Sequence, residues 1–246
     1  MPLRRDELTR IVRTIKKTFP EAKKIIVENA VEPAFGRSIS HNHFHIELPA
    51  TSAELEQRLS SKGRYNLRRE KRILTERFGN YEINHYKTQA PGIGKVWDFY
   101  FTMKENTYGT VYNLDETEYC KKYHVTDLYT LTLGEDNQIG SVILSCEQCP
   151  MVYLENLTYD QELAEFSPGQ VLYDEYLKML VSKRAKGVIL LGGKYSYKKR
   201  YGSVENQVYN CTIYRNSFIN TEKWAERKLR DIGHLIKEQL ENWRKR

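Results

Sequence analysis

The fold is decided at Phe166-Ser167-Pro168-Gly169-Gln170-Val171-Leu172, where a strand pattern gives way to a strongly periodic helix. Proline presets a helical φ and has no N–H to leave unpaired, and serine commonly caps a helix. The first N–H groups of a helix have no partner within it, so with the helix dipole they suit phosphate. The stretch therefore predicts a helix start that is either capped in the ordinary way or occupied by an anion.

The patterns on either side of this stretch predict an α/β fold. Apolar side chains recur at helical spacing from Leu172 to Val181, and the apolar run Val188–Leu191 is typical of a short central strand. Before the stretch, turn residues separate β-branched and aromatic runs at 127–133, 139–147 and 152–159. These runs predict an antiparallel meander. We expect a mixed, mostly antiparallel sheet flanked by helices.

Further elements are expected outside this centre. Helical periodicity, with a capping box at Thr51-Ser-Ala-Glu54, predicts helices over 2–19, 51–59, 62–78, 95–108 and 115–123, and a long amphipathic C-terminal helix over 221–246. Further strands are expected at 24–28, 41–46, 82–87 and 208–214. The chain then divides into an N-terminal extension over 1–60, a main domain over 61–219 and a C-terminal helix over 220–246.

The composition is that of a folded, basic protein. Of 246 residues, 40% are apolar and 29% charged, the net charge is +7, and the pI is about 9.0. A basic surplus suggests an anionic partner without choosing among nucleotides, nucleic acids, glycans and membranes. The densest basic run lies on the helix over 62–78, as a solvated face or an anion-facing surface, with Arg64, Arg68, Arg69 and Arg72. No aromatic-interleaved RNA motif accompanies it, which disfavours a nucleic-acid partner.

Membrane, secretory and metal signals are weak. No stretch approaches the ~18 consecutive apolar residues of a membrane span, and no signal-peptide pattern follows the N-terminus. We therefore expect a cytoplasmic protein with reduced cysteines. Cys146-x-x-Cys149 has no second pair at zinc spacing. His41, His43 and His45 alternate as on one strand face but lack a further ligand, so a polar face is favoured and no metal is expected.

Three segments resemble a known family. They are Ser61-Lys-Gly-Arg-Tyr-Asn-Leu-Arg-Arg69 with Lys71-Arg-Ile-Leu74, Tyr159 through Phe166-Ser-Pro-Gly169-Gln-Val-Leu172, and Gly192-Gly193 through Tyr197-Lys-Lys-Arg-Tyr201. Their order and spacing resemble the Gcn5-related N-acetyltransferase (GNAT) superfamily. The chain is similar to its cellulose-biosynthesis, or BioF2-like, branch and distantly to the FemAB peptidoglycan transferases. The turn has one glycine where the superfamily more often has Arg/Gln-x-x-Gly-x-Gly/Ala.

The resemblance implies an acetyl-CoA or other acyl-CoA site. The strand before the turn, at Glu155, Asn156 and Leu157, would be bulged and lie along the pantetheine arm. Backbone N–H groups of the turn would hold the pyrophosphate, and a lysine beyond the Gly-Gly break would hold an anionic group of donor or acceptor. The implied donor contacts are Asn156, Leu157, Ser167, Gly169, Gln170, Val171 and Lys198.

The resemblance also implies the catalytic groups. Glu155 would take a proton from the acceptor, directly or through water. Tyr197 or Tyr195 would protonate the departing thiolate. The expected acceptor is an amine or hydroxyl of a sugar or polysaccharide precursor.

Two other functions remain open at this level. A FemAB-like transferase would take an aminoacyl group from a charged tRNA, with the basic helix facing RNA phosphates. A non-catalytic relative would use the same fold to bind a partner. The C-terminal helix could cover the core or form a homodimer contact.

Overall fold

The chain forms two compact units, one of Met1–His43 with Asn206–Arg246 and one of Phe44–Glu205. The computed structural model describes residues 5–30, 37–109, 114–147, 151–190 and 196–214. The division of the chain at residues 60 and 219 that the sequence predicts stays a prediction. The predicted C-terminal helix over 220–246 lies outside the described residues.

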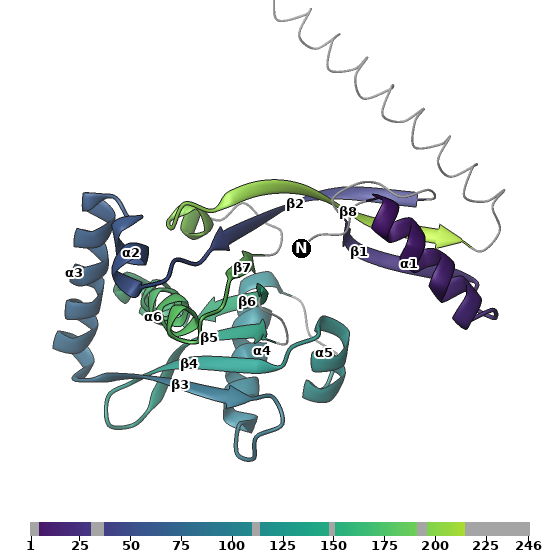
Figure 1. Ribbon diagram of the computed structural model, residues 1–246. Helices are drawn as coiled ribbons and strands as arrows, with labels where there is room; N and C mark the ends of the chain where they lie inside the picture. The colour runs from purple at the N-terminus through teal and green to yellow at the C-terminus, as the bar shows by residue number, and fades with distance from the viewer. Residues whose placement is uncertain (1–4, 31–36, 110–113, 148–150, 191–195, 215–246) are drawn as a thin grey trace, which may run out of the picture. The chain divides into compact units, whose positions relative to one another are not determined.

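A mixed sheet forms the centre of the unit Phe44–Glu205 (Figure 1). Its strand order is β2-β7-β6-β5-β4-β3. The strands are β2 (Arg37–Glu47), β3 (Tyr81–Lys87), β4 (Asp127–Leu133), β5 (Gln138–Cys146), β6 (Met151–Tyr159) and β7 (Gly187–Leu190). Only β6 and β7 pair in parallel, while the other recorded pairs of these strands are antiparallel. The expected α/β fold and its meander are confirmed.

Helices cover both faces of this sheet (Figure 1). On one face lie α2 (Ser52–Gln57), α3 (Ser61–Phe78) and α6 (Pro168–Ser182), and on the other lie α4 (Gly94–Tyr108) and α5 (Glu116–Tyr123). The alternation of β4 explains the two layers, because Tyr129, Leu131 and Leu133 join the core under α6 whereas Leu128 joins the core under α4. Two short 3₁₀ turns, η1 (Gln161–Phe166) and η2 (Ser196–Lys199), flank α6 and β7.

Local capping fixes where the first two helices of this unit begin. The Thr51 hydroxyl accepts a hydrogen bond from the Glu54 N–H at 3.2 Å, which confirms the capping box. The Ser60 hydroxyl accepts from the Gly63 N–H at 3.0 Å. Helix α3 ends at Gly79, whose φ of 81° is a conformation that glycine adopts readily.

The start of α6 is attached to β5. The buried Ser141 hydroxyl donates to the Pro168 carbonyl at 3.1 Å. A Cβ on Gly140 would lie 3.4 Å from the Pro168 Cβ and 3.1 Å from a Leu133 methyl carbon, so the glycine lets the helix approach closely. This attachment fixes the N-terminus of α6 beside the meander.

The other unit contains α1 (Arg5–Thr18), β1 (Lys24–Ala30), the part of β2 before Phe44 and most of β8 (Val204–Tyr214). Strands β1 and β8 pair antiparallel. A small core joins Val12 of α1 to Ile25, Cys211 and Ile213. Among the described residues, no helix has the length and hydropathy needed to cross a bilayer.

Candidate functional site

A cavity of about 500 Å³ opens within the unit Phe44–Glu205. Its walls come from the second half of β6, the end of α4, the N-terminus of α6 and η2. Pockets that bind small molecules commonly have about 300–1,000 Å³. Most of the site residues expected from the sequence line this cavity, namely Glu155, Asn156, Leu157, Ser167, Gly169, Gln170, Tyr197 and Lys198.

A bulge in β6 shapes one wall. Leu154 pairs with Ser145 and Asn156 pairs with Leu144, so Glu155 is an extra residue in the ladder. Such bulges re-aim side chains and are frequent next to active sites. On its other side, β6 pairs with β7 only from Met151 to Leu154. Among the described residues, no strand pairs with that side of β6 beyond the bulge, which leaves N–H and C=O groups for an extended ligand.

The N-terminus of α6 forms a second wall. Ser167 occupies the N-cap position with a left-handed backbone (φ 54°), and its side chain makes no capping bond. Ser167 is thus the N-cap residue that the sequence suggests, but its hydroxyl does not cap the helix, because this backbone conformation differs from the extended one of a capping residue. The first turn also has no acidic residue, so no side-chain charge in it offsets the positive end of the helix dipole.

The resemblance implies that the backbone N–H groups of Gly169, Gln170 and Val171 face a pyrophosphate. In the structure these three groups differ in their hydrogen bonds. Those of Gln170 and Val171 both donate to the Ser167 carbonyl, at 3.0 and 3.2 Å. Val171 is fully buried and does not line the cavity. Only the Gly169 N–H has no hydrogen-bond partner among the described residues. Of these three N–H groups, only that of Gly169 is therefore available to a ligand. Gln170 lines the cavity, but its N–H is taken, so it could contact a ligand only through its side chain.

Gly169 and Gln170 are held by close packing and by an arginine. A Cβ on Gly169 would lie 3.2 Å from a ring carbon of Tyr159, so the last residue of β6 packs directly on the helix start. The Gln170 side-chain oxygen accepts from Arg200 at 2.7 Å. That contact leaves the Gln170 amide nitrogen as a donor and brings a guanidinium to the same end of the cavity.

Two residues of η2, Tyr197 and Lys198, also line the cavity. The Tyr197 ring packs edge-on against the buried Tyr173 ring, with centroids 5.1 Å apart. The Lys198 side chain is buried, and its ammonium lies 5.8 Å from the centre of the Phe44 ring. Burial lowers the pKa of Lys198 to about 8. Tyr195, the other tyrosine expected near the site, lies outside the described residues, as do Gly192 and Gly193.

Lys104 of α4 also lines the cavity, although its role was not expected from the sequence. It is only 4% exposed. Burial lowers its pKa to about 8, while the carboxylate of Glu155 acts in the opposite direction. A signal was present, because Lys104 follows Trp97 and Tyr100 at helical spacing and so falls on the apolar face of its helix.

A buried ionic network connects α6 to neighbouring elements. The Asp174 carboxylate contacts the ammonium groups of Lys71 on α3, at 2.6 Å, and of Lys178, at 3.1 Å, and accepts from the Tyr201 hydroxyl. Burial alone would raise the pKa of Asp174, but Lys71 and these hydrogen bonds outweigh it and lower that pKa. Since Tyr201 lies two residues after the end of η2, this network ties the segment of Tyr197 and Lys198 to α6.

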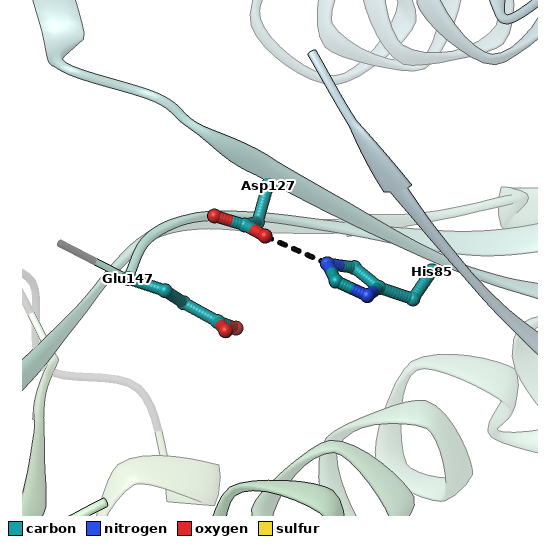
Figure 2. Close-up of side chains that lie close together, drawn as sticks. All are labelled: His85, Asp127 and Glu147. Carbon is teal, nitrogen blue, oxygen red and sulfur yellow. Dashed lines mark hydrogen bonds and ion pairs between the residues drawn. The ribbon is translucent and has the colours of Figure 1, made fainter. Parts of the chain in front are cut away.

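A second cluster of titratable groups lies on β3, β4 and the residue after β5 (Figure 2). The ligand atoms of His85, Asp127 and Glu147 lie within 4.8 Å of one another, which makes this group a candidate metal site within the described chain. However, Lys87 contacts Asp127 at 2.6 Å and Lys183 contacts Glu147 at 2.9 Å. Each carboxylate is already matched by an ammonium, which a metal ion would have to displace.

The expected basic surface on α3 is only partly exposed. Arg64 turns back on the chain, donating to the Leu59 carbonyl at 2.6 Å. Arg68, Arg69 and Arg72 are exposed, and Arg72 lies 3.5 Å from Glu76.

The histidines and cysteines considered as metal ligands lie elsewhere. The side chain of His41 is outside the described part of the chain, whereas that of His43 is buried. The thiol of Cys146 is free, and Cys149 lies outside the described residues.

Comparisons with known proteins agree with this fold. A family model described as an acetyltransferase (GNAT) domain matches residues 61–199, more than half of the chain. No curated protein sequence matches. FemX has a similar structure, with a TM-score of 0.53 and 10% identity over 83% of this chain and 69% of its own. The C-terminal domain of a putative lysylphosphatidylglycerol synthetase from Agrobacterium fabrum has a TM-score of 0.55 and 10% identity, over 89% and 78%. Identities this low show likeness of fold alone.

Proposed function

The chain belongs to the acetyltransferase (GNAT) domain family, and we propose that it transfers an acyl group from an acyl-CoA donor, acetyl-CoA in the first instance, to a sugar or polysaccharide precursor in the cytoplasm. One observation carries the donor assignment. The unpaired edge of β6 beyond Glu155 and the uncapped N-terminus of α6 lie on the same cavity. The acceptor class rests on the resemblance to the cellulose-biosynthesis branch.

The donor would bind along β6. Its pantetheine amides would pair with the open backbone of Asn156 and Leu157, as an added strand does. Its pyrophosphate would accept from the Gly169 N–H at the positive end of α6, with Gln170 and Lys198 beside it. These groups fit an anion, because the helix start supplies a donor without a capping side chain and without a competing carboxylate.

The chemistry needs one base and one acid. The nitrogen or oxygen of the acceptor would attack the thioester carbon while Glu155 takes its proton, directly or through a water molecule. The carbon–sulfur bond then breaks, and Tyr197 or Tyr195 would give its proton to the departing thiolate. The bulge supports the role of Glu155, because it presents that carboxylate to the cavity.

A FemAB-like activity with an aminoacyl-tRNA donor is the second candidate. The likeness to FemX concerns the fold, and the three exposed arginines of α3 are the surface on which RNA phosphates would bind. The two donors differ at α6, because a CoA donor brings a pyrophosphate to the helix N-terminus. The discriminating experiment therefore compares donors.

Thermal unfolding with CoA, acetyl-CoA and pantetheine tests the proposal. At 100 times its dissociation constant a ligand stabilises by about 2.7 kcal/mol, which raises the midpoint by roughly 5–11 °C in a chain of this size. We expect this shift with CoA and acetyl-CoA, and a much smaller one with pantetheine, which lacks the pyrophosphate. No shift at millimolar acetyl-CoA, together with salt-sensitive tRNA binding, would replace the proposal by the FemAB-like activity.

A further inference from the structure

Lys104 has an unusual position for a lysine. It lies on the buried face of α4 with Trp97 and Tyr100, and only 4% of its surface is exposed. Its ammonium lies 4.9 Å from the centre of the Tyr108 ring and 5.7 Å from that of Tyr100. Both contacts are in the range of cation–π attraction. The side chain is thus held between two rings at the wall of the cavity.

The charge of Lys104 is not balanced within the described chain. Its ammonium has no ion-pair or hydrogen-bond partner there, and Glu155 acts on it only at longer range. A buried charge is costly unless it is paired. Lys71 shows the contrast, because it contacts both Asp174 and Glu175, at 2.6 and 2.5 Å, and these carboxylates raise its pKa despite burial. Carboxylates of the protein thus balance the charge of Lys71, whereas the ammonium of Lys104 can still form an ion pair with a ligand.

The position of Lys104 along β6 shows which ligand it faces. Lys104 and Glu155 line the same cavity, where α4 packs on β6, and the charge of Glu155, at the bulge, acts to raise the pKa of Lys104. The helix start at Gly169 packs on Tyr159, four residues further along the strand, or about 13 Å at the usual rise per residue. An anion bound at Lys104 on the Glu155 side of the cavity would be separate from a pyrophosphate at Gly169. It lies at the end of the cavity where the reacting groups would meet.

We propose that the acceptor carries an anionic group, a phosphate or a carboxylate, and that Lys104 binds it and thereby selects the acceptor. The inference rests on the proposed acyltransferase function and adds the charge of its substrate. An anion at Lys104 supplies the partner that the chain lacks, and a charge-assisted hydrogen bond between them is stronger than a neutral one. The chemical class that fits is an amino sugar or sugar bearing one acidic substituent.

Calorimetric titration tests the proposal on the full chain with its donor site filled by CoA. The probes share one amino sugar, namely D-glucosamine, its 1-phosphate, its 6-phosphate, and muramic acid, which adds a carboxylate. We expect at least one anionic sugar to bind tenfold or more tightly than glucosamine. The Lys104→Met variant should lose this preference and Lys104→Arg should keep part of it. Lys95→Met, which removes an exposed lysine from the same helix, should keep it in full.

The outcomes separate the two hypotheses. If CoA binds but no anionic sugar is preferred, or if the preference survives in Lys104→Met, the anionic acceptor is refuted and the donor assignment stands. If CoA itself does not bind, the proposed function fails first. Methionine keeps the apolar stem of lysine, so Lys104→Met should unfold no earlier than the wild type. Lys104→Gln supplies the same comparison should that variant not fold.

Discussion

Replacing Asp174 with asparagine should loosen the attachment of the Tyr197 and Lys198 segment to α6. The carboxylate is 1% exposed and is the common partner of Lys71, Lys178 and the Tyr201 hydroxyl. Asparagine keeps the size of the side chain and can still accept from Tyr201, but it removes the negative charge. The change therefore isolates the ionic part of the network.

The expected loss follows from these contacts. Removing one partner of a buried ion pair costs about 3–5 kcal/mol. The loss should be smaller here, because Lys71 keeps Glu175 at 2.5 Å and Lys178 keeps Glu56 at 2.6 Å, and each lysine side chain is 21% exposed. We expect about 2–3 kcal/mol, or on the order of 4–12 °C in the thermal midpoint. Donor binding should weaken as well, since Lys198 loses its anchorage.

The pH dependence gives a second readout. The folded pKa of Asp174 is lowered, so its stabilisation is present above the unfolded pKa, near 4, and is lost as pH falls through the folded value. Urea unfolding of the wild type should therefore lose more stability between pH 5 and pH 2 than that of Asp174→Asn. Asp136→Asn, at an exposed turn, is the matched control. A loss below 0.5 kcal/mol, or equal pH slopes in both proteins, would refute the reasoning.

Three further changes test the site. Glu155→Gln should lower kcat by about 10²–10⁴ with little change in donor affinity, measured by steady-state kinetics, because it removes the base and not a donor contact. Donor affinity should fall as pH rises through about 8, where Lys198 loses its charge, and calorimetry on Lys198→Met should show no such fall. Ser141→Ala should cost about 1 kcal/mol in urea unfolding by removing the bond to Pro168, whereas exposed Ser182→Ala should change less than 0.5 kcal/mol.

Much of the fold follows from local sequence rules. The meander is predictable because turn residues separate β-branched runs, and the structure places β4 at the expected residues 127–133. The capping box at Thr51 likewise predicts the start of α2, because the cap depends only on residues three positions apart in the sequence. The 3₁₀ turn η1 was not predicted, because six residues with a single buried side chain, Leu163, carry no usable periodicity. The two compact units also could not be predicted, since long-range contacts define them.

The candidate site was predictable in part. The resemblance, together with the glycine and proline of the turn, indicated the residues of β6, α6 and η2 that now line one cavity. Their roles stay predictions. Lys104 was missed because it lies about 50 residues from Glu155 in the sequence, and only the packing of α4 against β6 brings the two charges together. Arg200 was missed as the partner of Gln170 for the same reason.

The missing side-chain cap at Ser167 is informative. Thr51, Ser60 and Asp115 each cap their helix through a side-chain oxygen, and Ser167 has the same capacity but a left-handed backbone that does not use it. A non-glycine residue in this region carries strain of order 1–3 kcal/mol. Sequences break local rules of this kind chiefly where function requires it. The strained backbone at Ser167 leaves the Gly169 N–H without a partner among the described residues at the start of α6, and this is the group that we propose binds the donor phosphate.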